Sequence, residues 1–373
     1  MKVAILTRTS AVNYGTILQS YALQSYVNGL NATALVVDDV MPRQMYSGMN
    51  VEKKRLSFKE KVGDFLDRRK LKKQYANAIK NEKLVRKFKK QYIEYFYPKT
   101  LQELNDNFDA FIAGSDQIWA YSAEPYMFPF FLLETISHNK IKASYAVSVG
   151  EKGYPDGYRA RVEELLNDFD YISVREKSSK SIIGQYTANE VFVACDPVLL
   201  IDSKEWVNLA GNRKVNKKYV FCYLLGKNDW YRNQIEEIAN YFSCEVIIIQ
   251  KEVAWDTYEQ VNSSSPKDFL NYIEFAEYIV TDSFHGFLFS LIFKKQFCLL
   301  QRFLDDGNNT QNRRLLDLIE KLEMNNGLLS EKDEWEFSVL NYDKIDQKVA
   351  PFIQSSRDYL KMVLCKNEGS NGK

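Results

Sequence analysis

Short apolar segments alternate with segments of helical periodicity along the chain, and this alternation limits the fold to a parallel α/β type. Residues 2–7 (KVAILT) are apolar and short, as expected of a buried strand, and a polar turn follows them. Residues 16–30 carry apolar side chains at helical spacing, and 32–39 (ATALVVDD) read as a second strand. This β–loop–α–β order predicts the start of a doubly wound sheet.

The same alternation continues and then begins again after a polar stretch at 211–218. We therefore predict two Rossmann-like domains that face each other across a cleft: residues 1–200, residues 201–340, and a C-terminal helix and tail at 341–373. The further predicted strands are 108–114, 141–150, 171–176, 191–200, 219–226, 245–250, 278–282 and 296–300, and the further predicted helices include 157–169, 269–276, 287–293 and 345–364.

Composition excludes several classes of protein. The formal net charge of +1 does not suggest a nucleic-acid binder, and a hydrophobic content of 45% suits a folded chain with sizeable cores. The five cysteines are scattered without a CxxC motif, and the chain has two histidines far apart. We therefore expect no metal site and no disulfide framework. The first residues show no apolar signal segment, so a cytoplasmic protein is expected.

Residues 52–99 interrupt the alternation with a strongly basic segment. They contain 17 lysines and arginines against six acidic residues, with apolar residues spaced as in helices. One interpretation is a solvated helical insert in the first domain. The other is a basic surface that makes peripheral contact with an anionic membrane, or with a lipid-diphosphate substrate, at the inner face of that membrane.

Ligands of doubly wound sheets bind beyond the carboxyl ends of the strands, so the residues there are the candidate site. Asn13, Tyr14 and Gly15 lie between the first strand and helix, without a GxGxxG or GK[ST] motif. They form either an anion-binding helix start or a plain cap. In the segment 114–119 (GSDQIW), Asp116 could accept a proton from a sugar hydroxyl, or could cap a helix.

Two later strand ends carry further polar residues. Asp196 precedes a proline, which is typical of a turn, although a functional carboxylate is the alternative. His285 lies in TDSFHG (281–286), between a predicted strand and a buried helix, and can carry a proton near neutral pH. A structural histidine is the competing interpretation. Arg302, Arg313 and Arg314 follow, and they suit a phosphate or carboxylate unless they form surface ion pairs.

Taken together, these segments resemble the polysaccharide pyruvyl transferase family. The resemblance spans about residues 1 to 325 and is carried by several motifs in matching order. These are NYGTILQSYALQ (13–24), AGSDQIW (113–119), SVRE (173–176), CDPVLL (195–200), TDSFHG (281–286) and NRRLLDLIEKL (312–322). The resemblance implies a fold like that of GT-B glycosyltransferases, with the donor site mostly in the second domain. It also implies transfer of pyruvate from phosphoenolpyruvate to two sugar hydroxyls as a cyclic ketal, in bacterial surface or capsular polysaccharide biosynthesis.

The resemblance assigns roles to individual residues. His285 matches the family histidine and is the expected acid, and Arg314 matches a donor-binding arginine. Ser283 occupies a position where some members have an arginine, so either Arg302, Arg313 or Arg175 supplies that charge or the donor is held differently. Asp116 is the expected base, and no cofactor or metal is required beyond the co-substrate phosphoenolpyruvate. The predicted donor side is Ser283, Gly286, Arg302, Arg313, Arg314 and Arg175, and the predicted acceptor side is Asn13, Tyr14, Gly15, Ser115 and Trp119.

Two other functions fit the same sequence. A glycosyltransferase of GT-B type would use the same pair of domains with a nucleotide sugar. A non-catalytic sugar-binding subunit of a polysaccharide assembly system would bind sugar without releasing phosphate. The sequence does not indicate the acceptor sugar, the ketal positions or whether the acceptor is linked to a lipid.

Overall fold

The computed structural model describes most of the chain in ten segments. They are residues 1–10, 12–40, 42, 79–121, 127–150, 153–250, 258–261, 263–303, 310–324 and 327–365. Most of the basic segment predicted at 52–99, namely residues 52–78, lies outside the described residues.

The first domain is built on a seven-stranded parallel sheet with the strand order β3-β2-β1-β4-β5-β6-β7. Its central strands are buried along almost their whole length, as expected of a sheet covered by helices on each side. The strands are β1 (Lys2–Leu6), β2 (Thr33–Val37), β3 (Tyr95–Phe96), β4 (Ala110–Asp116), β5 (Ile141–Val147), β6 (Ile172–Val174) and β7 (Val191–Val193). The helices are α1 (Tyr14–Asn28), residues 79–92, α4 (Leu101–Asn107), α5 (Phe128–Phe131), α6 (Arg159–Asn167) and α7 (Lys177–Ile183).

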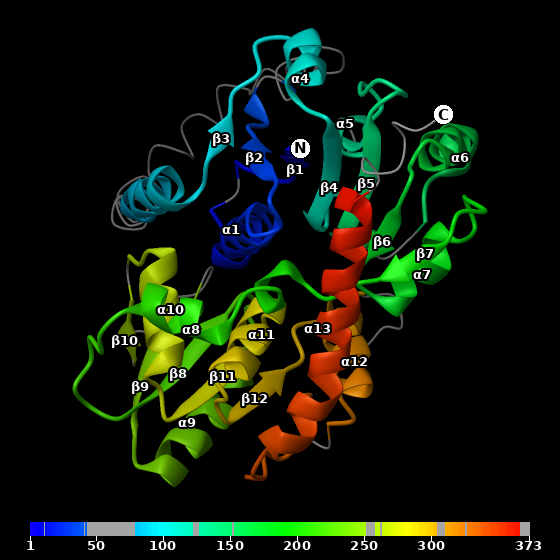
Figure 1. The fold of residues 1–373 in the computed structure, drawn as a ribbon. Helices are drawn as coiled ribbons and strands as arrows, with labels where there is room; N and C mark the ends of the chain where they lie inside the picture. The colour runs from blue at the N-terminus through cyan, green and yellow to red at the C-terminus, as the bar shows by residue number, and fades with distance from the viewer. Residues whose placement is uncertain are drawn as a thin grey trace, which may run out of the picture.

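The second domain repeats this plan on a six-stranded parallel sheet with the order β10-β9-β8-β11-β12-β13. Figure 1 shows the two sheets in separate halves of the molecule, each with helices packed beside it. The strands are β8 (Tyr219–Leu224), β9 (Glu245–Gln250), β10 (Glu259–Gln260), β11 (Tyr278–Thr281), β12 (Phe297–Leu300) and β13 (Leu328–Leu329). The helices are α8 (Ser203–Ala210), α9 (Tyr231–Phe242), α10 (Pro266–Glu274), α11 (Phe284–Ile292) and α12 (Thr310–Lys321).

Numbered within each domain, both sheets contain the order 3-2-1-4-5-6 of a Rossmann-like domain, and the first sheet adds a seventh strand at the end. The expected α/β fold with two such domains, of GT-B type, is therefore confirmed. The first strand of each half lies in the middle of its sheet, and the order reverses there. Loops at this switch point, after β1 and after β8, reach the edge where ligands of this fold class bind.

Side-chain caps shift several predicted boundaries. Asn13 accepts hydrogen bonds from the backbone N–H of Gly15 at 2.9 Å, so α1 begins two residues before the predicted start. Ser283 caps α11 in the same way, so the helix begins at Phe284 and His285 lies in its first turn. The strand predicted at 191–200 ends at Val193, because Asp196 caps a short 3₁₀ helix at Pro197–Leu199.

The long C-terminal helix α13 (Tyr342–Cys365) connects the two domains. It runs from the second domain across to the first, as Figure 1 shows in red. The hydroxyl of Tyr359 donates to the carbonyl of Ser144 in β5 at 2.9 Å, and the backbone N–H of Cys195 donates to the hydroxyl of Ser356 at 2.9 Å. The helix therefore holds the strand end that carries Cys195 and Asp196.

The described part of the basic segment forms a helix at 79–92. Lys89 in this helix is only partly exposed, and its ammonium group donates a hydrogen bond to the carbonyl of Thr9. Burial lowers the pKa of this lysine, although Asp39 and Asp38 oppose the change. Among the described residues, no helix combines the length and the apolar character that crossing a bilayer requires.

Candidate active site

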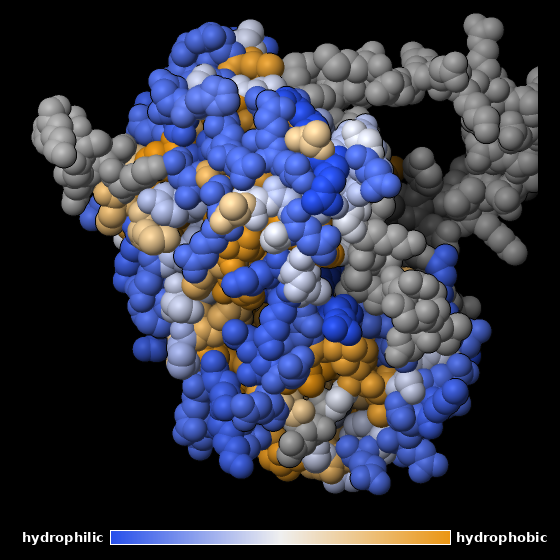
Figure 2. Space-filling model, turned by 90° about the vertical axis from the view of Figure 1, so that its right-hand side faces the viewer, coloured by the Kyte–Doolittle hydropathy of each residue, from blue (hydrophilic) through white to orange (hydrophobic). Residues whose placement is uncertain are grey.

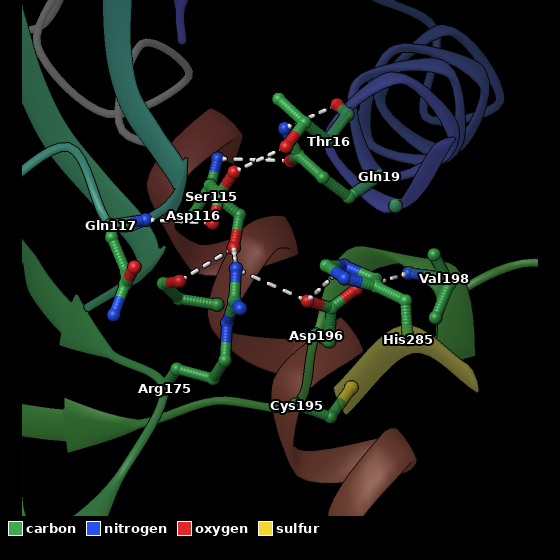
Figure 3. Close-up of polar contacts among 12 residues, drawn as sticks. Thr16, Gln19, Ser115, Asp116, Gln117, Arg175, Cys195, Asp196, Val198 and His285 are labelled. Carbon is green, nitrogen blue, oxygen red and sulfur yellow. Dashed lines mark hydrogen bonds and ion pairs between the residues drawn. The ribbon is translucent and has the colours of Figure 1, made fainter. Parts of the chain in front are cut away.

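Polar side chains from both domains converge where the carboxyl ends of the two sheets face each other. Figure 3 shows them at the boundary, with α1 on one side and the strand ends on the other. Five segments contribute, and each follows a strand. The contributing residues are Thr16 at the start of α1, Ser115 and Asp116 at the end of β4, Arg175 and Glu176 after β6, Asp196 after β7, and His285 after β11.

Asp196 lies at the centre of this arrangement. Its Oδ2 atom is 3.1 Å from Nη2 of Arg175 and 3.4 Å from Nε2 of His285, and its Oδ1 atom accepts from the backbone N–H of Val198 at 3.0 Å. The Asp196 side chain is fully buried. Burial alone would raise the pKa of this carboxyl, but Arg175 and His285 hold it below its usual range. Asp196 is therefore an ionised group that orients one side chain from each domain.

His285 comes from the second domain and packs directly against the first. A Cβ atom at Gly15 would lie 2.1 Å from Nδ1 of His285, so only glycine lets the imidazole ring approach α1 this closely. The His285 side chain is 9% exposed. With Nε2 directed at Asp196 and Nδ1 at Gly15, the orientation of the ring is fixed by both domains (Figure 3).

Ser115 and Asp116 hold the first-domain side of the site. The hydroxyl of Ser115 accepts from Nη2 of Arg175 at 2.6 Å and donates to the carbonyl of Ala146 at 2.6 Å. Oδ2 of Asp116 accepts from the hydroxyl of Thr16 at 2.7 Å. Burial by itself would raise the pKa of Asp116, but Arg175, His285 and the Thr16 hydrogen bond together hold it well below its usual range. Asp116 is therefore a carboxylate at neutral pH.

Two guanidinium groups border a small cavity at the domain boundary. Arg175 and Arg314 both lie over the ring of Phe284, at 5.3 Å and 5.7 Å from its centroid. Within the described residues, Nε and Nη1 of Arg175 and Nε of Arg314 are buried without a hydrogen-bond partner. The cavity that these residues share with Glu176 and Asp196 has a volume of about 30 Å³. Buried, unsatisfied guanidinium N–H groups are suited to bind a phosphate or carboxylate.

Glu176 adds a third carboxyl group to this cavity. It is 4% exposed, and its Oε2 atom accepts from the hydroxyl of Ser179 at 2.8 Å. Its Oε1 atom has no hydrogen-bond partner among the described residues. Burial raises the pKa of Glu176, although Arg175 and Arg314 oppose the rise.

A groove of about 600 Å³ lies next to this cavity, between α7, β7, α12 and α13. Val193, Lys321 and Phe352 line both the groove and the cavity, and the ammonium group of Lys321 lies 3.7 Å from the centroid of the Phe352 ring. Figure 2 views the molecule from the side on which α6 and α7 lie in Figure 1, and shows a band of apolar residues bordered by hydrophilic ones. The lysine and the aromatic ring therefore separate the cavity from the surface.

Two residues of the predicted ligand site do not line the cavity. Trp119 is fully buried, donates from its indole N–H to the carbonyl of Phe131 at 2.9 Å and packs edge-on against Phe169. It is a core residue and presents no face to a sugar. The Arg313 side chain is 64% exposed, lies 3.6 Å from Asp317 on its own helix and does not line the cavity that Arg314 lines.

Other predicted residues have structural partners next to the site. Tyr14 donates to Ser264 across the domain boundary and stacks on Phe269, with a centroid distance of 5.3 Å. Arg302 pairs with Asp282, with 3.3 Å between Nε and Oδ2, and does not line the cavity. A Cβ atom at Gly286 would lie 2.3 Å from Oγ1 of Thr281, so this glycine allows α11 to pack on β11. Asn13 and Ser283 serve as helix caps.

The comparison with known protein families agrees with this geometry. The sequence profile of the polysaccharide pyruvyl transferases matches residues 13–302, which include the site residues from Thr16 to His285 but not Arg314. The chain belongs to the polysaccharide pyruvyl transferase family. The resemblance inferred from the motifs is thus confirmed. A search of curated proteins found no match to this sequence.

Several solved structures share the fold of this pyruvyl transferase family member at low identity. UDP-GlcNAc 2-epimerase from Methanocaldococcus jannaschii is 12% identical, with a TM-score of 0.45 and coverage of 96% of this chain and 94% of that chain. The Neisseria meningitidis UDP-GlcNAc 2-epimerase bound to UDP-GlcNAc is 11% identical, with a TM-score of 0.46 and coverage of 97% and 94%. The wall teichoic acid polymerase TagF is 9% identical, with a TM-score of 0.43 and coverage of 97% and 82%. These similarities concern the fold alone.

The described residues contain no group of three or more histidine, cysteine, aspartate or glutamate side chains that could hold a metal ion. Sequence reasoning gave Asp196 mainly a turn-forming role and did not select Thr16 or Glu176. One signal could have identified Glu176, because it is the last residue of the predicted strand 171–176 and so lies at the same edge of the sheet as Asp116. Asp196 precedes Pro197, which cannot continue the pairing of the predicted strand 191–200.

Proposed function

We propose that this protein transfers pyruvate from phosphoenolpyruvate to two hydroxyl groups of a sugar and forms a cyclic ketal, as a step in building a surface or capsular polysaccharide. The observation that supports this proposal is that Arg175 and Arg314 line one cavity between the domains, and that His285 contacts Asp196 in the lining of the same cavity. Phosphoenolpyruvate joins a phosphate and a carboxylate in a very small molecule, so a site for it needs closely spaced guanidinium groups.

The donor would bind to the N–H groups of Arg175 and Arg314 that lack partners among the described residues. The cavity of about 30 Å³ has room for a water molecule or two, but not for phosphoenolpyruvate. Donor binding therefore requires the two domains to move apart and then close on the ligand. Closure would exclude water from the reacting carbon.

In the proposed reaction, His285 donates a proton to the methylene carbon of phosphoenolpyruvate, and the adjacent enol carbon becomes cation-like. One sugar hydroxyl forms a bond to that carbon, the bond to the phosphate oxygen breaks, and the second hydroxyl closes the ring. The two hydroxyl protons balance the proton added to carbon and the proton carried by the released phosphate. Asp196 orients the imidazole ring throughout, because its Oδ2 atom contacts Nε2.

Asp116 suits a different role from the base expected from the sequence. Its pKa is held low, and its two oxygens accept from the Thr16 hydroxyl and from the backbone N–H of Gln117. A carboxylate with a lowered pKa is a weak proton acceptor. We propose that Asp116 instead stabilises the cation-like carbon by its charge and helps to hold an acceptor hydroxyl.

The decisive experiment is a phosphate-release assay with phosphoenolpyruvate and lipid-linked, nucleotide-linked or polymeric galactosides, with mass spectrometry of the sugar product. We expect His285→Ala to lower turnover about 10²-fold to 10⁴-fold with the fold retained. His138→Ala is the matched control, because His138 is exposed and pairs with Asp168 away from the site. Likewise, Arg314→Ala should raise the KM for phosphoenolpyruvate, whereas the exposed neighbour Arg313→Ala should not.

The alternative functions give different results in the same experiment. A glycosyltransferase would be stabilised against heating by a nucleotide sugar and not by phosphoenolpyruvate. A sugar-binding subunit would bind the acceptor without releasing phosphate. Either result with the purified protein would overturn the proposal.

A further inference from the structure

Glu176 and Asp317 are the carboxyl groups at the cavity for which the proposed reaction has no role so far, and of the two only Glu176 has an oxygen that is buried without a hydrogen-bond partner among the described residues. It follows β6 directly, beside Arg175, and its position is fixed because Oε2 accepts from Ser179 in α7. Glu176 lines the cavity, and its Oε1 atom is buried and has no hydrogen-bond partner among the described residues. An unpaired buried carboxylate oxygen is costly, so its retention calls for a ligand or a proton.

The charges around Glu176 come from every element that borders the cavity. Arg175 and Lys177 flank it in sequence, Arg314, Asp317 and Lys321 come from α12, and Asp196 follows β7. The Cys195 thiol also lines the cavity, and burial raises its pKa to about 11. Burial raises the pKa of Glu176, although Arg175 and Arg314 oppose this rise. Burial lowers the pKa of Arg314, and the negative charge of Glu176 opposes that decrease.

An anionic donor on Arg175 and Arg314 would use the same guanidinium groups that now compensate the charge of Glu176. A carboxylate beside that donor would repel it and would lose its counter-charge. Protonation of Glu176 removes both costs and leaves a neutral carboxyl group that can donate a hydrogen bond to the donor phosphate. This is the arrangement that an acid for the leaving group requires.

We propose that Glu176 takes up one proton when phosphoenolpyruvate binds, and that this carboxyl group protonates the phosphate as it leaves. This inference rests on the proposed function. When the bond between the enol carbon and the bridging oxygen breaks, its electron pair stays on that oxygen and the proton of Glu176 passes to the phosphate. Of the two protons released by the sugar hydroxyls, one restores His285 and the other restores Glu176, so no further reagent is needed.

The test is calorimetric titration of the full-length protein with phosphoenolpyruvate at about pH 8, in buffers that differ in ionisation enthalpy, since the buffer dependence of the heat counts the protons taken up. We expect the wild type to take up about one proton more than Glu176→Gln. Any proton taken up by phosphoenolpyruvate itself is common to both proteins and cancels. Equal proton uptake by the two proteins would overturn the inference.

The kinetic constants kcat and KM provide a second test, because a merely structural role of Glu176 would not change kcat alone. Glu176→Gln should lower kcat for phosphate release about 10²-fold or more, while the KM for phosphoenolpyruvate stays the same or falls. Glu176→Asp should recover part of the loss. Glu190→Gln is the control, because Glu190 is exposed. A raised KM with unchanged kcat in Glu176→Gln would contradict the inference.

A failure of the role of Glu176 can be distinguished from a failure of the proposed function. If the wild type binds and turns over phosphoenolpyruvate without the extra proton, the role of Glu176 is wrong and the pyruvyl transfer stands. If the wild type neither binds phosphoenolpyruvate nor releases phosphate, the proposed function itself is wrong. Should Glu176→Gln fail to fold, the pH dependence of proton uptake by the wild type alone still decides, because uptake that stays at zero from about pH 6 to pH 8.5 would exclude the inference.

Discussion

At the residue scale, the contact between Gly15 and His285 determines whether the imidazole ring can lie beside Asp196. A methyl group at Gly15 would overlap the ring, with Cβ 2.1 Å from Nδ1 and 2.2 Å from Cγ. We expect Gly15→Ala to displace the ring or separate the domains, and to lower turnover about 10²-fold, as a misplaced catalytic group does. The measurement is phosphate release from phosphoenolpyruvate in the presence of acceptor.

Gly157→Ala is the matched control for this substitution. A Cβ atom there would meet nothing within 4 Å, so turnover should stay within about two-fold of the wild type. If Gly15→Ala turns over as fast as Gly157→Ala, the position of His285 against α1 does not matter for the reaction.

The two carboxyl groups Asp116 and Glu176 should affect stability with opposite dependence on pH. The pKa of Asp116 is lowered in the folded protein, so its contribution to stability is present above about pH 4 and is lost as the pH falls further. The pKa of Glu176 is raised, so its ionisation destabilises the fold, and this cost grows as the pH rises above about 4.

Urea unfolding of Asp116→Asn and Glu176→Gln across the pH range measures both effects. Relative to the wild type, Asp116→Asn should be destabilised near neutral pH and less so in acid. Glu176→Gln should gain stability as the pH rises from about 4 to about 8. A difference from the wild type that is the same at every pH would show that the carboxyl concerned titrates alike in the folded and unfolded chain.

The sequence identified some of these residues and missed others for a physical reason. His285 and Asp116 were selected because each follows a predicted strand, and strand ends of a parallel sheet share one edge. Arg175 was selected only as one of the arginines that could supply the charge missing at Ser283. Arg313 and Arg314 are neighbours in sequence, but successive side chains point about 100° apart on a helix, and of these two only Arg314 lines the cavity. Which one does so depends on how α12 packs, and the sequence pattern does not contain that information.

At the scale of elements, α13 holds the segment that follows β7, the last strand of the first domain, through a hydrogen bond to Ser356. This side chain is fully buried, and its oxygen accepts the backbone N–H of Cys195 at 2.9 Å. Ser356→Ala leaves that N–H without this acceptor, so we expect a loss of about 1–3 kcal/mol in the free energy of unfolding. Chemical denaturation of the purified variant measures the change.

The adjacent Ser355 provides the control. Both serines donate to the carbonyl of Phe352, at 3.0 Å and 2.7 Å, but Ser355 is exposed and accepts nothing from the first domain. Ser355→Ala should therefore change the free energy of unfolding by less than about 0.5 kcal/mol. Equal losses in both variants would mean that the bond to Cys195 adds no stability.

The basic segment at 52–99 remains a proposed membrane contact. The structure shows that one of its lysines is unsuitable for the test. Lys89 bonds to the Thr9 carbonyl, so its replacement would disturb the first domain and confuse the result. We expect charge reversal at Lys72, Lys73 and Lys90 to weaken sedimentation with anionic vesicles, because each basic residue near such a surface adds about 1 kcal/mol. Reversal of three exposed lysines of the second domain, Lys204, Lys227 and Lys332, is the control. Equal loss in both triple variants would remove the segment from the interaction.

Long periodic elements were predicted well, and short ones were not. The predicted helix at 345–364 corresponds to α13, whereas α4, α5, α7 and α8 were not predicted. Each of these four helices has eight residues or fewer, which is too short to show a repeated apolar face. Side-chain caps and contacts with the sheet define them instead.

At the scale of the whole molecule, the strand alternation predicts each domain but not how the domains meet. Their contact depends on individual groups, such as Tyr14 on Ser264 and Asp196 against His285. None of these contacts repeats along the sequence, so no periodicity indicates them. The closed position nevertheless determines the chemistry, because it alone brings the histidine of one domain to the aspartate of the other.

This closed position leads to a prediction for the free protein in solution. The cavity of about 30 Å³ cannot admit phosphoenolpyruvate, so a working enzyme must also adopt an open form. We expect small-angle X-ray scattering of the free protein to give a radius of gyration larger than that calculated from the closed structure, and phosphoenolpyruvate to reduce it. Closure should depend on contacts with the donor. At the same donor concentration, the radius of gyration of Arg314→Ala should therefore stay unchanged, whereas that of Arg313→Ala should decrease. A radius of gyration that matches the closed structure with and without donor would mean that the domains do not open, and the donor would have to reach the site by another route.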